Sequence, residues 1–396
     1  MVPKGWTLLQ VSDICKLQNG NSFKPHEWDT QGLPIIRIQN LNGSDNYNYF
    51  SGVPQDKWLV EPGQLLFSWA GTKGVSFGPF IWNGPKGVLN QHIYKVFANE
   101  NVHGHWLYLA LLHITQKIEA QAHGFKSTLL HVQKKDIDNQ FVLTPPVAEQ
   151  KKIAQILSTW DNAISVTEKL LTNSQLQKKA LMQKLLTGKK RLLDENGVSF
   201  SGAWKWLRAA ELFKTISQKN NSEDEELLAV TQDLGVIPRS MLERRVVMPD
   251  GSTKGYKLVV PGNFIISLRS FQGGLEYSRY RGLVSPAYTV LTPIKKIVDE
   301  FYKQYYKSYD FIGHLAVAVI GIRDGKQISY EDFSFLKLPY PEIEEQQKIA
   351  AVLSAADAEI STLEKKLACL RDEKKALMQQ LLTGKRRVKV DEAVAV

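Results

Sequence analysis

The sequence contains few cysteines and no long apolar run. Only Cys15 and Cys369 occur among 396 residues, far apart and without metal-ligand spacing, which favours a reducing compartment. The N-terminal stretch lacks the apolar core of a signal peptide, and the longest apolar-rich run, residues 311–322, is too short to cross a bilayer. We therefore expect a cytoplasmic protein without a membrane segment.

Motifs for catalysis and cofactor binding are also absent. The Thr-Gly-Lys at 187–189 and at 383–385 lacks the upstream glycine of a phosphate-binding loop and follows a predicted helix instead of opening one. The two closest histidines, His103 and His105, have no further ligand at metal-binding spacing, and no HExxH motif or nucleophile elbow occurs. The sequence thus predicts a protein that is not an enzyme and that holds no cofactor or metal.

The composition is that of a basic globular protein. Apolar residues make up 43% of the chain and charged residues 23%, while the net charge is +10 and the pI is about 9.3. A positive balance of this size indicates a polyanionic partner such as nucleic acid, although it is equally consistent with simple solubility.

One long segment occurs twice. The 41 residues from Glu149 and the 41 from Glu345 are identical at 24 positions, at a constant offset of 196. Prolines precede both copies, and Gly188 and Gly384 follow them as helix-terminating glycines would. Each copy therefore predicts a helix of roughly 40 residues and about 60 Å.

Apolar residues recur in both copies with the period of 3.5 that is typical of a coiled-coil seam. The predicted helix-pairing residues are Ile153, Leu157, Trp160, Ile164, Leu171, Leu181 and Leu185, and Ile349, Leu353, Ile360, Leu363, Leu367, Leu377 and Leu381. Polar residues interrupt the seam at Thr167, Ser174, Lys178 and Lys374, and we interpret them as devices that fix the alignment. The simplest partner for each helix is the other one, in antiparallel orientation.

The remaining chain forms two similar globular domains. We expect an α+β fold with domain 1 at 1–144, the first long helix at 145–190, a connector and domain 2 at 191–340, and the second helix and tail at 341–396. The segment 60–68 matches 259–267, and Trp206 is taken as the counterpart of Trp6. The sequence therefore predicts a pseudo-twofold internal repeat, with two readers placed for two half-sites on a DNA duplex.

Polar and basic residues in the glycine- and asparagine-rich loops of both domains are candidates for DNA contact. Arginine and lysine bind phosphates and guanine, and glutamine and asparagine read adenine. The predicted DNA-binding residues are Lys24, Arg37, Gln39, Asn40, Lys73, Gln91 and Lys126 in domain 1, and Lys219, Arg239, Arg269, Arg279, Arg281, Arg323 and Lys326 in domain 2. Because the two sets of loops differ, we expect the domains to read different sequences.

The repeated segment, with its Glu-Gln opening and its Lys-Lys-Ala-Leu-Met-Gln and Leu-Leu-Thr-Gly-Lys runs, resembles the specificity subunit of type I restriction-modification systems. The resemblance covers essentially the whole chain. It is strongest in the repeated helix at Pro145–Lys189 and Pro341–Lys385, and the Gly-Trp opening of the first domain also resembles the family. It implies two target recognition domains that read a bipartite DNA site in double-stranded DNA, with the paired helices as a spacer.

The resemblance also implies partners that carry the chemistry. Two modification subunits would use S-adenosylmethionine to methylate adenine N6, and restriction subunits would use ATP and magnesium in phage defence. Two alternatives remain at this stage: a coiled-coil adaptor without a nucleic-acid role, which leaves the divergent basic domains unexplained, and a fused enzyme, for which the chain lacks several hundred residues.

Overall fold

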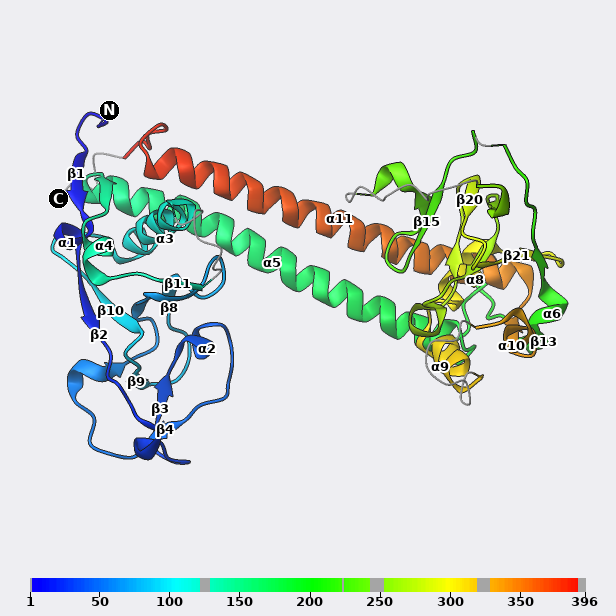
Figure 1. Cartoon of the computed structure of the whole chain (residues 1–396), viewed down its shortest axis with the longest axis horizontal. Coiled ribbons are helices and arrows are strands. Elements are labelled where there is room, and N and C mark those ends of the chain that lie inside the picture. Colours follow the sequence, from blue (N-terminus) through cyan, green and yellow to red (C-terminus); the bar gives the residue numbers. More distant parts are fainter. Residues whose placement is uncertain (1, 122–128, 223, 243–252, 319–327, 391–396) are drawn as a thin grey trace. The chain divides into compact units, whose positions relative to one another are not determined.

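The computed structural model describes residues 2–121, 129–222, 224–242, 253–318 and 328–390 (Figure 1). The chain divides into two compact units: unit 1 is Met1–Val166 with Leu367–Val396, and unit 2 is Thr167–Lys366. Each unit therefore holds one globular domain together with a segment of both long helices.

Unit 1 begins with a mixed α+β domain. Its strands are β1 (Thr7–Gln10), β2 (Cys15–Asn19), β3 (Leu33–Ile36), β4 (Tyr49–Phe50), β5 (Leu59–Val60), β6 (Leu65–Ser68), β7 (Ala70–Thr72), β8 (Gly78–Ile81), β9 (Gly87–Leu89), β10 (Ile93–Ala98), β11 (Leu129–His131) and β12 (Phe141–Thr144). Its helices are α1 (Val11–Ile14), α2 (Ile38–Leu41), α3 (Gly104–Gln121) and α4 (Lys134–Asp138), with 3-10 turns η1 (Pro25–Glu27) and η2 (Asp56–Trp58).

These strands form two four-stranded sheets, β2-β10-β6-β8 and β4-β3-β9-β5, and two smaller pairs, β1-β12 and β11-β7. The main core lies between the first sheet and α3, whose apolar residues Trp106, Leu107 and Leu111 are at most 1% exposed. Burial of this face explains why α3 forms, because a surface helix is stabilised mainly by the packing of its apolar side.

Unit 2 repeats this plan. Its strands are β13 (Lys205–Arg208), β14 (Phe213–Ile216), β15 (Leu228–Thr231), β16 (Gly235–Pro238), β17 (Lys257–Val259), β18 (Phe264–Ile266), β19 (Glu276–Tyr277), β20 (Gly282–Val284), β21 (Thr289–Pro293) and β22 (Lys337–Tyr340). Its helices are α6 (Ala209–Leu212), α7 (Ser270–Gly273), α8 (Asp299–Tyr305), α9 (Tyr309–Ala318) and α10 (Tyr330–Ser334), with 3-10 turns η4 (Arg239–Met241) and η5 (Thr253–Gly255).

The sheet β14-β21-β18-β19 has the same order as β2-β10-β6-β8, and the pair β13-β22 matches β1-β12. The matched segments found in the sequence also correspond, because Gly63 and Gly262 both adopt positive φ, 89° and 95°, in the turn before β6 and β18. A positive φ favours glycine, so this turn accounts for the Pro-Gly dipeptide in each domain.

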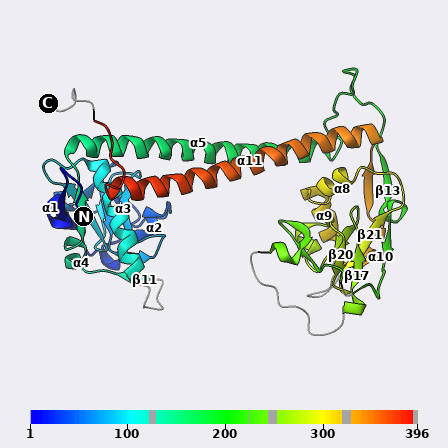
Figure 2. The ribbon, with the colours of Figure 1, turned by 90° about the horizontal axis from the view of Figure 1, so that it is seen from above.

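The two long helices are α5 (Val147–Leu185, 39 residues) and α11 (Ile343–Leu382, 40 residues). Gly188 and Gly384 end them with φ of 69° and 66°, as the sequence predicts for helix-terminating glycines. In each unit a segment of α5 runs beside a segment of α11 in antiparallel orientation (Figures 1 and 2).

The seam of these helices is visible in their burial. All fourteen predicted pairing residues are buried or partly buried, including Trp160 and Leu171, which retain partial exposure. The polar interruptions lie in the same seam: Ser174 Oγ donates to Glu359 Oε1 at 2.9 Å, and Thr167 is 3% exposed.

Lys178 pairs with Asp357 in unit 2, and Lys374 pairs with Asp161 in unit 1. Lys374 and Asp357 stand 196 positions after Lys178 and Asp161, so the two ion pairs are the same contact in the two halves of the repeat. A lysine inside an apolar seam is stabilised where its carboxylate lies opposite, which makes register shifts costly.

The stretch 33–41 divides into β3 and α2, and Asn40 Oδ1 accepts the Arg37 N–H at 2.9 Å at the start of the helix. Residues 299–318 form two helices, α8 and α9, with a turn at Ser308. One sequence-based expectation needs correction: the register of β1–β12 and β13–β22 aligns Leu8 with Trp206, so the counterpart of Trp6 is Trp204 and not Trp206.

Candidate DNA interface

Among the predicted DNA-contacting residues of unit 1, Arg37 has its guanidinium held against an aromatic ring. It lies at the end of β3 with its guanidinium 5.2 Å from the ring centre of Trp28, and its buried Nε has no hydrogen-bond partner. Stacking on an aromatic ring holds the guanidinium plane in place, and a fixed plane suits bidentate contact with guanine. Trp28, which the sequence analysis missed, carries this geometry.

The neighbouring loop is held by its own amides. Asn40 is only 5% exposed, and its side-chain nitrogen donates to the Ser44 and Asn46 carbonyls. The exposed Gln39 also donates to the Asn46 carbonyl, at 2.9 Å. Lys24 is exposed at the start of η1, four residues before Trp28. Arg37 and Gln39 thus lie together at the start of α2, where Asn40 supports the loop that follows.

Gln91 lies in a second region, beside an aromatic cluster. Trp69 Nε1 donates to the Gln91 carbonyl at 3.0 Å, and the Trp69 ring packs against His92 and His131. Burial, and secondarily the nearby His131, lowers the pKa of His92, so this histidine is neutral near pH 7. The cluster therefore presents aromatic surface in which burial favours the neutral form of His92.

Lys73 is directed toward its own domain. Its Nζ donates to the Glu119 carbonyl in α3 at 2.8 Å, and the Gly74 N–H donates to the Glu119 carboxylate at 2.7 Å. These bonds attach the loop after β7 to α3, which gives Lys73 a structural role in this state.

In unit 2, two of the predicted DNA-binding residues pair with carboxylates of the same unit. Arg279 pairs with Glu300, and Arg281 donates from Nη2 to Glu225 Oε1 at 2.7 Å. Both arginine side chains keep more than half of their exposure, so these surface pairs contribute little stability and can exchange for phosphate. The other described candidates are exposed at Lys219 and Arg269 and partly buried at Arg239.

A groove of about 470 Å³ adjoins Arg279 in unit 2. The β15–β16 turn forms one wall, where Gln232 Nε2 donates to the Arg269 carbonyl at 3.3 Å. Lys307 in the groove pairs with Glu276. Burial raises the pKa of Glu276, although its contact with Lys307 opposes the shift. Both acidic and basic side chains line this groove, so its surface is polar but not strongly positive.

Three predicted DNA-binding residues, Lys126, Arg323 and Lys326, lie outside the described residues. The candidates that the structure describes lie on several different loops and strand ends of each unit. No group of three or more potential metal ligands occurs among the described residues, and none of the described helices is long and apolar enough to span a membrane.

Where each domain meets the long helices, a tryptophan, a glutamate and an arginine form contacts that were not predicted from the sequence. In unit 1, Trp6 Nε1 donates to Glu149 Oε2 at 3.2 Å, and Arg387 donates to both oxygens of the same carboxylate. The Arg387 guanidinium also lies 5.6 Å from the Trp6 ring centre and donates to the Lys4 carbonyl. We call these three residues the Trp–Glu–Arg clamp of unit 1.

Unit 2 has the same clamp. Trp204 Nε1 donates to Glu345 Oε2 at 2.9 Å, and Arg191 donates to both oxygens of Glu345 at 2.6 and 2.7 Å. Arg191 stacks 5.8 Å from the Trp204 ring centre and donates to the Gly202 carbonyl. Trp206 is 43% exposed and makes no such contact, which establishes Trp204 as the counterpart of Trp6.

Contacts between each domain and a long helix explain the Glu-Gln pair at the start of that helix. The glutamate belongs to the clamp, and the glutamine accepts a backbone N–H of the domain. Gln150 accepts the His103 N–H at 2.8 Å, and Gln346 accepts the Val298 N–H at 2.9 Å. Each domain is thus fixed to the start of one long helix and to the segment that follows the end of the other. The repeated residues build a common frame, whereas the loops on it differ.

Comparison with known proteins identifies the family to which this repeated arrangement of domain and helix belongs. The family model described as the type I restriction modification DNA specificity domain matches residues 3–174 and 204–370. A putative type I restriction enzyme specificity subunit (MjaX) of Methanocaldococcus jannaschii is 27% identical over 98% of this chain and 95% of its own length. The MjaVIII specificity subunit of the same organism is 25% identical over 98% and 94%.

Two solved structures have a similar fold. The specificity subunit from M. genitalium aligns over 96% of both chains with a TM-score of 0.57 and 15% identity. A chain from a study of complex assembly and conformational transition of the type I restriction-modification system aligns over 98% of this chain and all of its own, with a TM-score of 0.56 and 16% identity. The predicted α+β fold with two paired antiparallel helices is confirmed.

Proposed function

The chain belongs to the family of type I restriction-modification DNA specificity subunits, and from this premise we propose that each globular domain reads one half of a bipartite DNA site. It is the specificity subunit, the non-catalytic part of such a complex. The observation that carries the proposal is the repeated Trp–Glu–Arg clamp: one frame, built twice, supports two different sets of loops.

The candidate readers differ in kind between the domains. Arg37, stacked on Trp28, offers a fixed guanidinium in unit 1. At the corresponding place in unit 2, β15 and β16 form a short hairpin, and the exposed Arg269 lies beside its Gln232. Arginine at a base edge favours guanine, and glutamine favours adenine. Different loop chemistry on a common frame fits two unlike half-sites.

The long helices act as a ruler in this proposal. A helix of 39 residues rises about 58 Å, which exceeds the roughly 34–36 Å between half-sites one turn of DNA apart. The ion pairs of Lys178 and Lys374 fix the helix register and would keep the spacing constant. The length of unread DNA between the half-sites then follows from helix length.

The chain takes part in the assembly of a type I restriction-modification complex. We propose that its partners are two modification subunits, which bind S-adenosylmethionine and methylate adenine, and restriction subunits that use ATP and magnesium. Two copies of a modification subunit require two similar surfaces, and the duplicated frame supplies them.

Selection of DNA from a random pool tests this function. The chain, assembled with the modification subunits encoded beside it, should enrich duplexes with two short constant segments at a fixed separation. Arg37→Ala should relax only one segment, and Arg269→Ala only the other. Enrichment of one continuous motif, or no enrichment by an assembled complex, would reject bipartite reading.

A further inference from the structure

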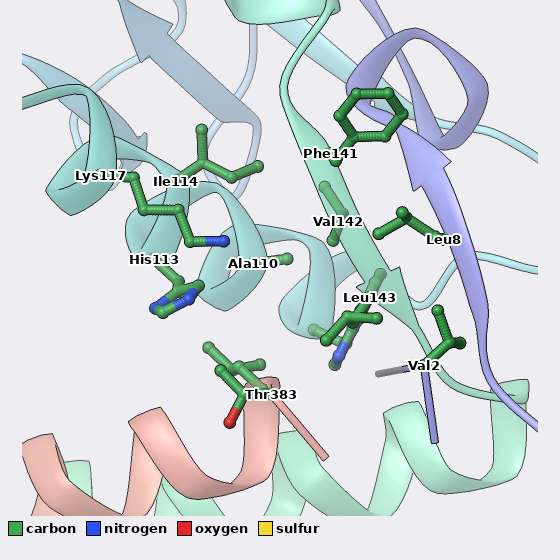
Figure 3. A pocket seen from close by; sticks show the side chains of 12 residues that line it. Val2, Leu8, Ala110, His113, Ile114, Lys117, Phe141, Val142, Leu143 and Thr383 are labelled. Atoms are coloured by element: carbon green, nitrogen blue, oxygen red, sulfur yellow. The ribbon is translucent and has the colours of Figure 1, made fainter. Parts of the chain in front are cut away.

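Unit 1 contains a notch that is lined by none of the predicted DNA-contacting residues. It has a volume of about 270 Å³ and lies between α3, the β1–β12 pair and the last turn of α11 (Figure 3). Three side chains at this notch, Val2, Leu8 and Phe141, are 42%, 47% and 55% exposed. Apolar side chains gathered around a hollow are typical of a protein interaction site.

The wall of the notch contains nitrogen atoms without a hydrogen-bond partner among the described residues. They are Trp106 Nε1 and both ring nitrogens of His113, which lie two helical turns apart on α3. Trp106 is only 1% exposed, its Nε1 is buried, and its side chain lines the notch. Buried N–H groups are almost always paired, and an unpaired one at a hollow favours a ligand that brings a hydrogen-bond acceptor.

The equivalent positions of unit 2 have different residues. The bonds from His103 to Gln150 and from Val298 to Gln346 align α3 with α8, so that Ala110 corresponds to Tyr305. Tyr305 is fully buried, whereas Ala110 leaves space on the face that lines the notch.

The strands around the notch differ as well. The register of β1–β12 and β13–β22 aligns Leu8 with Trp206, and Phe141 with the exposed Lys337. The apolar rim and the small residue at its centre therefore belong to unit 1.

We propose that this notch is an anchor for one modification subunit, which inserts an apolar side chain and presents a main-chain carbonyl to Trp106 Nε1. The proposal rests on the function above and adds that the two modification subunits bind unequally, with the additional anchor in unit 1. Lys117 beside the notch accommodates an acidic residue next to the inserted side chain.

Other occupants fit the notch less well. DNA phosphates need several positive charges, and Lys117 is the only lysine or arginine among the residues that line the notch. A second copy of this chain would need a contact of about 1,000 Å² or more, far beyond three exposed apolar side chains. A subunit that also contacts the repeated frame needs the notch only as one anchor within a larger interface.

Native mass spectrometry of the chain co-expressed with its modification subunit tests the proposal. The wild-type chain should bind two partners. Leu8→Glu, which places a charge on the rim, and Ala110→Tyr, which introduces the residue found in unit 2, should each lower the ratio of two-partner to one-partner complexes at least tenfold. The matched control Trp206→Glu should change this ratio less than threefold.

The outcomes separate the anchor from the function on which it rests. If the wild-type chain binds two partners and both unit 1 variants retain them, the anchor is refuted while the specificity function stands. An equal loss from Trp206→Glu, or a dimer of the chain that Leu8→Glu dissolves, would also refute it. If the wild-type chain binds no modification subunit, the proposed function itself fails.

Discussion

The two clamps allow one prediction to be worked out in detail, because they share their chemistry and differ in burial. The side chains of Glu345 and Arg191 are 1% and 23% exposed, whereas that of Arg387 is 41% exposed. Arg191→Ala leaves a fully buried carboxylate with Trp204 Nε1 as its remaining donor in the clamp. Removal of one partner of such a pair costs about 3–5 kcal/mol.

Arg387→Ala should cost less. Water can reach the space beside Glu149 when the half-exposed guanidinium is removed, so we expect a loss of about 1–2 kcal/mol. Arg191→Lys keeps the charge but loses the bidentate geometry and should fall between wild type and Arg191→Ala.

Hydrogen exchange measured by mass spectrometry reports each unit separately. Amide protection in the helices of unit 2 should fall on the order of 10²–10⁴-fold in Arg191→Ala, with unit 1 little changed, and about tenfold in unit 1 of Arg387→Ala. A smaller loss in Arg191→Ala than in Arg387→Ala would contradict the assignment of the clamps as buried and half-exposed versions of one contact.

Three further predictions concern spacing, modularity and pH. Insertion of four residues near Ser174, one helical turn, should lengthen the unread spacer and leave both half-sites unchanged; a constant spacer in DNA selection would refute the ruler. Replacement of residues 1–144 by the corresponding domain of a relative should alter one half-site, and a change in both would exclude modular reading. Burial lowers the pKa of His113 to about 4, so the unfolded chain binds a proton near pH 6.5 that the folded chain does not. Stability should therefore fall by up to about 1.4 kcal/mol per pH unit between pH 6.5 and 4, and His113→Gln should flatten this slope in a denaturant titration; an unchanged slope would contradict it.

The long helices, their partnership and the domain plan could be predicted from the sequence because each has a periodic or repeated signal. Helix ends were readable from Gly188 and Gly384, and the seam from its 3.5-residue period. The equivalence of Trp6 and Trp204 was missed because Trp204 and Trp206 are two residues apart. In an extended chain both side chains point to the same face, so the sequence pattern does not tell them apart. The hydrogen bond to Glu345 and the strand register distinguish them, and that hydrogen bond joins residues 141 positions apart.

The DNA-contacting residues were less predictable for a different reason. A surface lysine or arginine has the same local pattern whether its partner is a phosphate or a group of its own chain. Lys73 binds the Glu119 carbonyl, and Arg279 and Arg281 pair with carboxylates that are distant in sequence. Arg37 has its special feature, the Trp28 ring, nine residues away across a turn, where no periodicity reports it.

The central claim is that one chain reads two unlike half-sites at a fixed separation. Single-molecule sequencing of DNA from cells that express this chain with its neighbouring modification subunit measures this most directly. We expect methylated adenines in a split motif, with two short specific segments and a constant gap. Methylation at a continuous site, or at one half-site with no second segment at a fixed distance, would contradict the account.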